Sequence, residues 1–217
     1  MKKKSILFFA VLGIIKAQSI SIPADTAIVT FHTTQIKNKK IDYSATTGTQ
    51  PVWNDDGAPI AAVHYTYYER QNINNRASRP ILISFNGGPG SGSVWMHLAY
   101  TGPMILKVDD EGFPVQPYGV KKNPYSILDI ADIVFVNPVN TGYSRILDKK
   151  VKKETFFGVN ADIKYLAEWI NTFIQRVNRW ESPKYLIGES YGTTRVSGLA
   201  HALQNRQWMY LNGVISV

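Results

Sequence analysis

Four short apolar runs that lack polar alternation limit the folds open to this chain of 217 residues. The runs are ILISF, DIVFV, KYLIG and NGVISV. A strand with one face in water alternates apolar and polar residues, whereas a strand of a parallel sheet is covered on both faces and is apolar throughout. The four runs therefore predict a mostly parallel sheet with helices on both faces.

The segments between these runs have helical periodicity. Apolar residues recur at spacings of three and four over 159–177, which predicts an amphipathic helix of about 20 residues, and a second helix is predicted over 191–204. Alternation of strand and helix indicates an α/β fold. Nearer the N-terminus, 27–36 and 61–70 are rich in strand-forming residues, and the turn residues between them predict an antiparallel edge hairpin.

Residues 1–18 have the layout of a secretory signal peptide, with three lysines before an apolar stretch that is too short for the roughly 20 residues of a membrane span. We therefore expect a secreted or periplasmic protein without stable membrane association after cleavage. Residues 19–217 are then expected to form part of a single catalytic domain. Ile15 and Lys16 match the small-residue cleavage pattern poorly, so an uncleaved anchor is the alternative.

Charge and composition exclude several classes of protein. Setting aside the four lysines of residues 1–18 reduces the formal charge from +8 to +4. The basic clusters at 37–40 and 148–153 contain no aromatic residues, which favours solvated loops over nucleic-acid binding. The absence of cysteine excludes disulfides and thiol nucleophiles, and the four histidines lack ligand spacing. We expect neither a metal nor a cofactor.

One segment has the pattern of a nucleophile elbow. Gly188, Ser190 and Gly192 form GxSxG between a predicted strand and a predicted helix. Glycines at these positions permit a turn so tight that the serine hydroxyl is exposed at the positive end of the helix. The alternative is an ordinary turn with a capping serine.

A second segment supplies what such a serine needs. Acyl transfer requires backbone donors where the carbonyl oxygen becomes negative, and SFNGGPGSGS follows the first apolar run. Gly87 and Gly88 let the main chain approach a substrate closely. The two segments together favour a hydrolase, and a plain turn at the second segment is the alternative.

Three blocks resemble the serine carboxypeptidase family in the same order: FNGGPGSGS, KKNPYSILDIADIVFVNPVNTGYS and GESYGTTR. The resemblance extends from Ile81 to Val217. It implies an α/β-hydrolase fold and release of C-terminal amino acids from peptides through an acyl-enzyme. Many members have cysteine at the position of Ser91, so this chain is similar to a bacterial-type branch without disulfides.

The resemblance also implies roles for individual residues. Ser190 would be the nucleophile, and the amides of Gly88 and Tyr191 would form the oxyanion hole. The free carboxylate of the peptide would be bound by Asn86, the Gly87 amide and Glu189. Two carboxyl groups in contact share one proton, so binding should strengthen at acidic pH. A solvated or helix-capping Glu189 is the alternative.

Two departures affect this assignment. Tyr100 occupies a position where the family often has a second glutamate, and VNPVNTGYS lacks the acidic residue of the usual DQPVGTGFS. Proton sharing would then depend on Glu189 alone, and we expect no acidic substrate contact from VNPVNTGYS.

The rest of a catalytic triad is not evident. In α/β-hydrolases an acid and then a histidine follow the serine, but residues 191–217 contain His201 and no acid. His201 lies about 16 Å along the predicted helix from Ser190, too far to take its proton, and no acid is placed to orient His97. We therefore expect an N-terminal portion of a longer hydrolase, inactive alone, with the Asp and His beyond residue 217. An esterase, an acyltransferase or a non-catalytic binding fragment of this fold are the alternatives.

Overall fold

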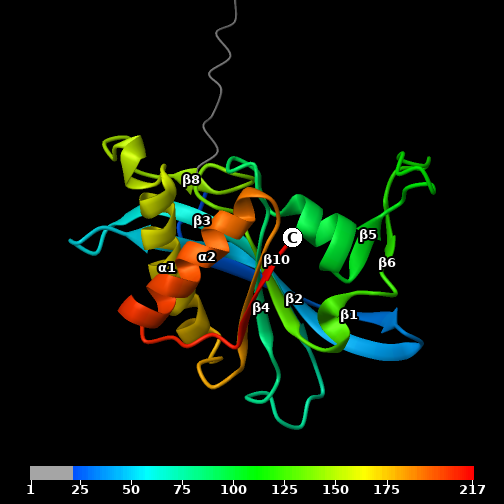
Figure 1. Cartoon of the computed structure of the whole chain (residues 1–217). Coiled ribbons are helices and arrows are strands. Elements are labelled where there is room, and N and C mark those ends of the chain that lie inside the picture. Colours follow the sequence, from blue (N-terminus) through cyan, green and yellow to red (C-terminus); the bar gives the residue numbers. More distant parts are fainter. Residues whose placement is uncertain (1–21) are drawn as a thin grey trace, which may run out of the picture.

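The computed structural model describes residues 22–217 (Figure 1), so the signal peptide predicted over 1–18 lies outside the described residues. One mixed sheet has the strand order β1-β2-β3-β7-β4-β9-β10, and β8 (Arg145–Ile146) also pairs with β3. The four predicted apolar runs are adjacent parallel strands, which confirms the expected α/β fold. They are β4 (Ile81–Phe85), β7 (Asp132–Val136), β9 (Lys184–Gly188) and β10 (Gly213–Ser216).

The predicted N-terminal hairpin was wrong in its pairing. β1 (Thr26–Ile36) does not pair with β3 (Pro59–Arg70), because β2 (Lys39–Trp53) lies between them and is antiparallel to both. A two-residue turn joins β1 to β2, with positive φ angles of 47° at Lys37 and 62° at Asn38. These angles suit the primed turns of tight hairpins.

The sequence of β2 looked like a loop because it contains Gly48 and Pro51 among threonines. Both residues have a place in the strand. A Cβ at Gly48 would collide with the backbone of Thr26, so glycine permits the close approach of β1. Pro51 lies beyond Thr49, the last β2 residue paired with β1, where a missing amide is tolerated because β2 has a partner on one side only.

Both predicted helices are present, as α1 (Val159–Arg176) and α2 (Tyr191–Arg206). Figure 1 shows them on one side of the sheet, with the green helical segment of η1 (Met96–Thr101) on the other. Apolar side chains of α1 and α2 form the main core with β3, β4, β7 and β9. The smaller core beneath η1 contains Met96 and the opposite face of the same strands. The remaining short elements are β5 (Met104–Leu106), β6 (Val120–Lys122), η2 (Ile127–Asp129) and η3 (Lys153–Thr155).

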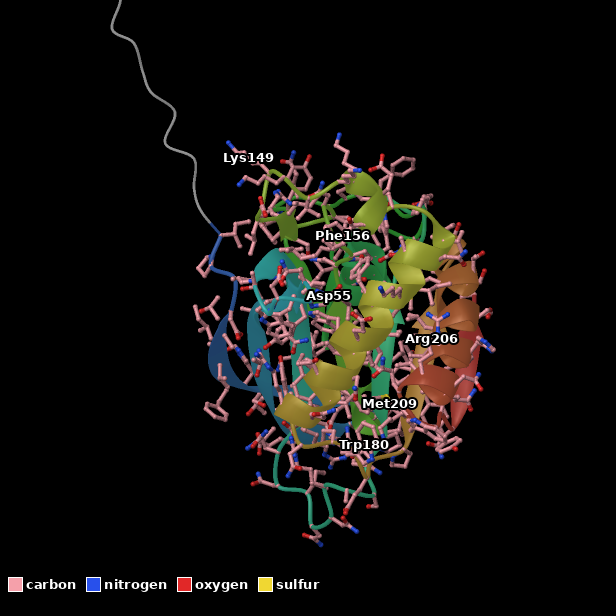
Figure 2. All side chains as sticks on the ribbon, turned by 90° about the vertical axis from the view of Figure 1, so that its left-hand side faces the viewer. Asp55, Lys149, Phe156, Trp180, Arg206 and Met209 are labelled. Atoms are coloured by element: carbon pink, nitrogen blue, oxygen red, sulfur yellow. The ribbon has the colours of Figure 1, made fainter. Side chains whose placement is uncertain are left out.

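The contact between α1 and α2 depends on a small residue. A Cβ at Gly198 of α2 would collide with the side chain of Ile163 of α1. Figure 2 views this layer from the α1 side, with Phe156 near the start of α1 and Trp180 beyond its end. Since the two helices connect β7 to β9 and β9 to β10, their packing holds the three strands in register. Within residues 22–217, no helix is both long and apolar enough to cross a membrane.

A buried charge cluster fixes the amino ends of the parallel strands. Asp132, the first residue of β7, is fully buried and accepts hydrogen bonds from Arg79 Nε at 2.7 Å and from Arg179. Arg179 also donates to the Tyr67 hydroxyl at 2.9 Å and to the Arg79 carbonyl at 2.6 Å. The cluster therefore joins β3, β7 and the segments that precede β4 and β9.

We predict that Asp132→Asn lowers the free energy of unfolding by about 3–5 kcal/mol, because it leaves Arg79 without its carboxylate and leaves Arg179 only Glu69, 3.7 Å away. Asp25→Asn is the matched control: Asp25 pairs with Arg176 at 2.8 Å, but both side chains are well exposed. Its expected effect is about 1 kcal/mol or less. Urea unfolding of both variants measures the difference, and equal losses would contradict the structural role of the Asp132 cluster.

Candidate active site

Ser190 occupies a strained turn between β9 and α2. Its φ of 55° and ψ of −120° are unusual for a residue with a side chain, and Ser190 is exposed at the start of α2. The Ser190 amide donates to the Val217 carbonyl at 3.0 Å, and the Val217 amide donates to the Gly188 carbonyl at 3.0 Å. The geometry is that of a nucleophile elbow, and the end of β10 holds it in this conformation.

The glycine-rich loop, residues 86–90, packs directly against this elbow. A Cβ at Gly87 would be 2.6 Å from the Tyr191 nitrogen and 2.7 Å from Ser190 Cβ, so only glycine fits without displacement. The register explains the proximity, because Phe85 at the end of β4 is opposite Gly188 at the end of β9. The two predicted segments thus converge, as the hydrolase hypothesis requires.

The loop also contacts the residue before the serine. Glu189 Oε2 accepts a hydrogen bond from Asn86 Nδ2 at 3.2 Å and from the Gly87 amide at 3.3 Å. Asn86 is buried, and its Oδ1 accepts from the Met96 amide at 3.0 Å. The three residues expected to bind a carboxylate therefore form one hydrogen-bonded group, which we call the Glu189 group.

One backbone amide of the glycine-rich loop and one of the elbow remain available as donors. Tyr191 is the first residue of α2, where an amide has no partner inside the helix. Gly88 has a φ of +72° and is exposed. Neither amide donates a hydrogen bond to another residue in the described range. Both can therefore donate to an external oxygen, and the helix start adds a favourable positive potential.

A cavity of about 440 Å³ opens beside the elbow and the loop. Its lining includes Pro89, Gly90 and Tyr191, and on the far side Val139, Phe156 and Phe157. Arg195 and Asp162 also border it. The walls are mainly apolar, so the space can accommodate an apolar group of a bound molecule.

The four histidines all have hydrogen-bond partners other than Ser190. His64 contacts Asn137 and Thr47, His97 contacts Tyr68, His32 contacts Thr30, and His201 contacts Asn205. His201 is exposed on α2, in agreement with the sequence interpretation. No histidine of residues 22–217 is hydrogen-bonded to Ser190, and within this range no group of three or more potential metal ligands occurs.

Sequence reasoning missed two charged residues of the site. Arg195 is almost fully buried in α2, and its Nε donates to Asp162 Oδ2 of α1 at 2.7 Å. Asp162 did give a signal, because it lies within the apolar stripe of α1, next to Ile163 and four residues before Leu166. An acid at such a position indicates a buried partner. Periodicity could not identify that partner as Arg195.

His97 generates a prediction about stability and pH. Its ring stacks on Phe135 with centroids 4.4 Å apart, and its Nε2 lies 2.7 Å from the Tyr68 hydroxyl. Burial, followed by repulsion from His64, lowers the pKa of His97 to about 4. The unfolded chain, with an ordinary histidine pKa of about 6.5, therefore binds the proton first as the pH falls.

We expect this histidine to stabilise the fold above pH 6.5 and to lose that contribution, on the order of 3 kcal/mol, between pH 6.5 and 4. His97→Gln should therefore unfold with a weaker dependence on pH across this window, as measured by urea titrations at several pH values. His201→Gln, on an exposed ring, should keep the slope of the parent. An unchanged slope in His97→Gln would refute the assignment.

Close packing at Gly87 generates a second prediction. Gly87→Ala should destabilise the protein by about 1–3 kcal/mol, because the added methyl group must displace backbone atoms of the elbow. Gly119→Ala is the control, since nothing lies within 4 Å of a Cβ at that position. Thermal unfolding of the two variants provides the comparison, and equal midpoints would contradict the tight contact.

Comparisons of sequence and of fold both find similarity to carboxypeptidases. The family model described as serine carboxypeptidase matches residues 42–215. Serine carboxypeptidase-like 8 of Arabidopsis thaliana is 27% identical over 148 residues, 68% of this chain and 33% of that protein. Carboxypeptidase Y of Saccharomyces cerevisiae is 28% identical over 129 residues, 59% of this chain and 22% of that protein. The chain thus spans about a third or less of these relatives.

A crystal structure of a prohormone-processing carboxypeptidase from Saccharomyces cerevisiae superposes with a TM-score of 0.61 and 19% identity. The match covers 80% of this chain and 38% of that one, and at this identity it establishes the fold. The family model, by contrast, covers most of the sequence, including both glycine-rich segments. The chain therefore belongs to the serine carboxypeptidase family.

Proposed function

We propose that Ser190 is the nucleophile of a serine-type carboxypeptidase that releases C-terminal amino acids from peptides. The observation that carries this proposal is the hydrogen bonding of the Glu189 carboxyl group to Asn86 and Gly87, directly before the strained Ser190. A carboxyl group in that position can hold the end of a peptide. The last peptide bond would then lie over the serine.

The available groups suit acyl transfer. Ser190 Oγ attacks the last peptide carbonyl, and the C-terminal amino acid leaves as the amine while the remaining peptide stays esterified to the serine. Water then hydrolyses this ester and regenerates the hydroxyl. The Gly88 and Tyr191 amides stabilise the negative oxygen in both steps. No base for Ser190 is assigned within residues 22–217, and an Asp and a His beyond residue 217 stay a prediction.

Recognition of a free C-terminus follows from proton sharing. The substrate carboxylate and the Glu189 carboxyl group repel each other when both are ionised, and they attract each other when one proton lies between them. Asn86 Nδ2 and the Gly87 amide, which now contact Glu189, can also donate to a bound carboxylate. The proposed substrate is therefore a peptide with a free C-terminal carboxylate, bound best at acidic pH.

The cellular setting rests on the sequence. The layout of residues 1–18 supports the proposals of export and of a catalytic domain that begins at residue 19. Ser91, where many family members have cysteine, supports the proposal of a bacterial-type branch. The two relatives compared above are both named as carboxypeptidases or carboxypeptidase-like proteins, which supports a peptidase over an esterase.

Binding measurements in a Ser190→Ala background test this proposal, since hydrolysis cannot remove the ligand. We predict that acetyl-Phe-Leu binds at least tenfold more tightly at pH 5 than at pH 8, as measured by calorimetry. The C-terminal amide of the same dipeptide should bind weakly at both values. Adding Glu189→Gln should abolish the pH dependence, because the amide side chain cannot share a proton.

Equal affinity of the Ser190→Ala protein for acid and amide would exclude the carboxypeptidase assignment. The rate of peptide hydrolysis is measured separately from binding, on a polypeptide that contains this sequence. Ser190→Ala should reduce leucine release by on the order of 10³-fold or more. If esters with blocked C-termini are hydrolysed as fast as those with free C-termini, an esterase or acyltransferase is favoured instead. Binding without any hydrolysis would favour a non-catalytic module.

A further inference from the structure

Arg195 is a buried cation whose contacts all belong to segments that build the site. Its side chain is 1% exposed, and its guanidinium carbon lies 5.2 Å from the Tyr191 ring centroid and 5.7 Å from that of Phe85. Nη1 donates to the main-chain carbonyl of Asn86 at 3.0 Å. One side chain of α2 thus contacts the end of β4, the glycine-rich loop and the residue after the nucleophile.

Asp162 holds this guanidinium in a fixed position. Its Oδ2 accepts from Arg195 Nε at 2.7 Å, and its Oδ1 accepts from the Tyr165 hydroxyl at 3.3 Å. The Tyr165 oxygen in turn accepts from the Val139 amide at 3.0 Å. The carboxylate therefore neutralises Arg195 and fixes its orientation, so that Nη1 remains directed at the loop.

The carbonyl that Arg195 contacts is one half of a functional peptide group. The Asn86 carbonyl and the Gly87 amide belong to the same planar peptide unit and point in opposite directions. On one side Arg195 donates to the oxygen, and on the other the Gly87 amide donates to Glu189 Oε2 at 3.3 Å. Rotation of this peptide unit would break both hydrogen bonds together.

We infer that Arg195 is a positioning residue that orients and polarises the Asn86–Gly87 peptide group, so that the Gly87 amide is directed at a bound carboxylate. A charged donor on the oxygen withdraws electron density from the peptide group and makes its amide a stronger donor. The ligand class, a C-terminal carboxylate, rests on the proposed function. The orientation of the peptide group does not.

Because the residue after Asn86 is glycine, the orientation of the Asn86–Gly87 peptide group depends on hydrogen bonds from other residues. Gly87 cannot bear a side chain against the elbow, and Gly88 has a positive φ. Gly87, at one end of the Asn86–Gly87 peptide group, leaves this group fewer intrinsic restraints than a residue with a side chain would. Hydrogen bonds at both ends of the peptide unit replace them, and Arg195 provides the one from the protein core.

Selective isotope labelling observes this peptide group directly. Asn-Gly occurs twice in the sequence, at 86–87 and 212–213. Labelling asparagine with ¹³C at the carbonyl and glycine with ¹⁵N therefore leaves two signals in a carbonyl-correlated amide spectrum. The second pair is an internal control, because the Asn212 side chain bonds Lys184 rather than the site.

The test variant is Arg195→Met with Asp162→Asn, which removes both charges and leaves no buried ion unpaired. We expect the Gly87 amide proton and the Asn86 carbonyl carbon to move upfield, since both hydrogen bonds weaken, while the Gly213 signals keep their positions. Affinity for acetyl-Phe-Leu, measured in the Ser190→Ala background at pH 5, should fall about tenfold. The amide of that dipeptide should show no comparable loss.

Arg195→Lys is the second variant, and it tests the positioning role of Arg195 if the double variant does not fold. A lysine ammonium keeps the charge but cannot span Asp162 and Asn86 with a planar fork, so intermediate shifts are expected. Gly87 and Asn86 signals at their parental positions in a folded variant would overturn the inference. If the parent itself does not bind acetyl-Phe-Leu, the proposed function fails, whereas the shifts still report on the positioning role.

Discussion

The site depends on the adjacency of two parallel strands, β4 and β9. Because Phe85 and Gly188 are partners at their carboxyl ends, the segments that follow both strands leave the sheet at the same point. Gly87 then approaches the elbow so closely that any side chain would displace backbone atoms. Ligand sites of open α/β sheets lie at such carboxyl ends, and here the approach brings the Gly87 amide to the Glu189 carboxyl group, directly before Ser190.

Two buried ion pairs hold opposite ends of this sheet. The Asp132 cluster joins the amino ends of the parallel strands, far in the sheet from the serine, and its effect is on stability. The pair of Asp162 and Arg195 lies at the carboxyl ends and contacts the glycine-rich loop. Replacing a whole buried pair by packed apolar residues is often neutral, whereas removing one partner is costly. The pair at the carboxyl ends also fixes geometry, which matters most beside a segment made of glycines.

Sequence patterns predicted local elements better than their pairing. The apolar stripe of α1 and the continuous apolar strands are local properties, and both were confirmed. The pairing of β1 with β3 was wrong, since Gly48 and Pro51 looked like turn residues. Gly48 lies in a strand because β1 approaches it closely, and Pro51 is tolerated because β1 has already ended. The neighbouring strand, not the residues themselves, decides both.

By itself the sequence determined the fold class, the elbow at Ser190 and the loop at Gly87 and Gly88, because glycine, proline and apolar spacing restrict the backbone locally. Only the tertiary structure decided that Glu189 bonds the loop and that Arg195, seven residues past the end of β9 in the next helix, donates a hydrogen bond to it. Such contacts join residues about a hundred positions apart. A charged side chain reveals its partner only when the chain has folded around it.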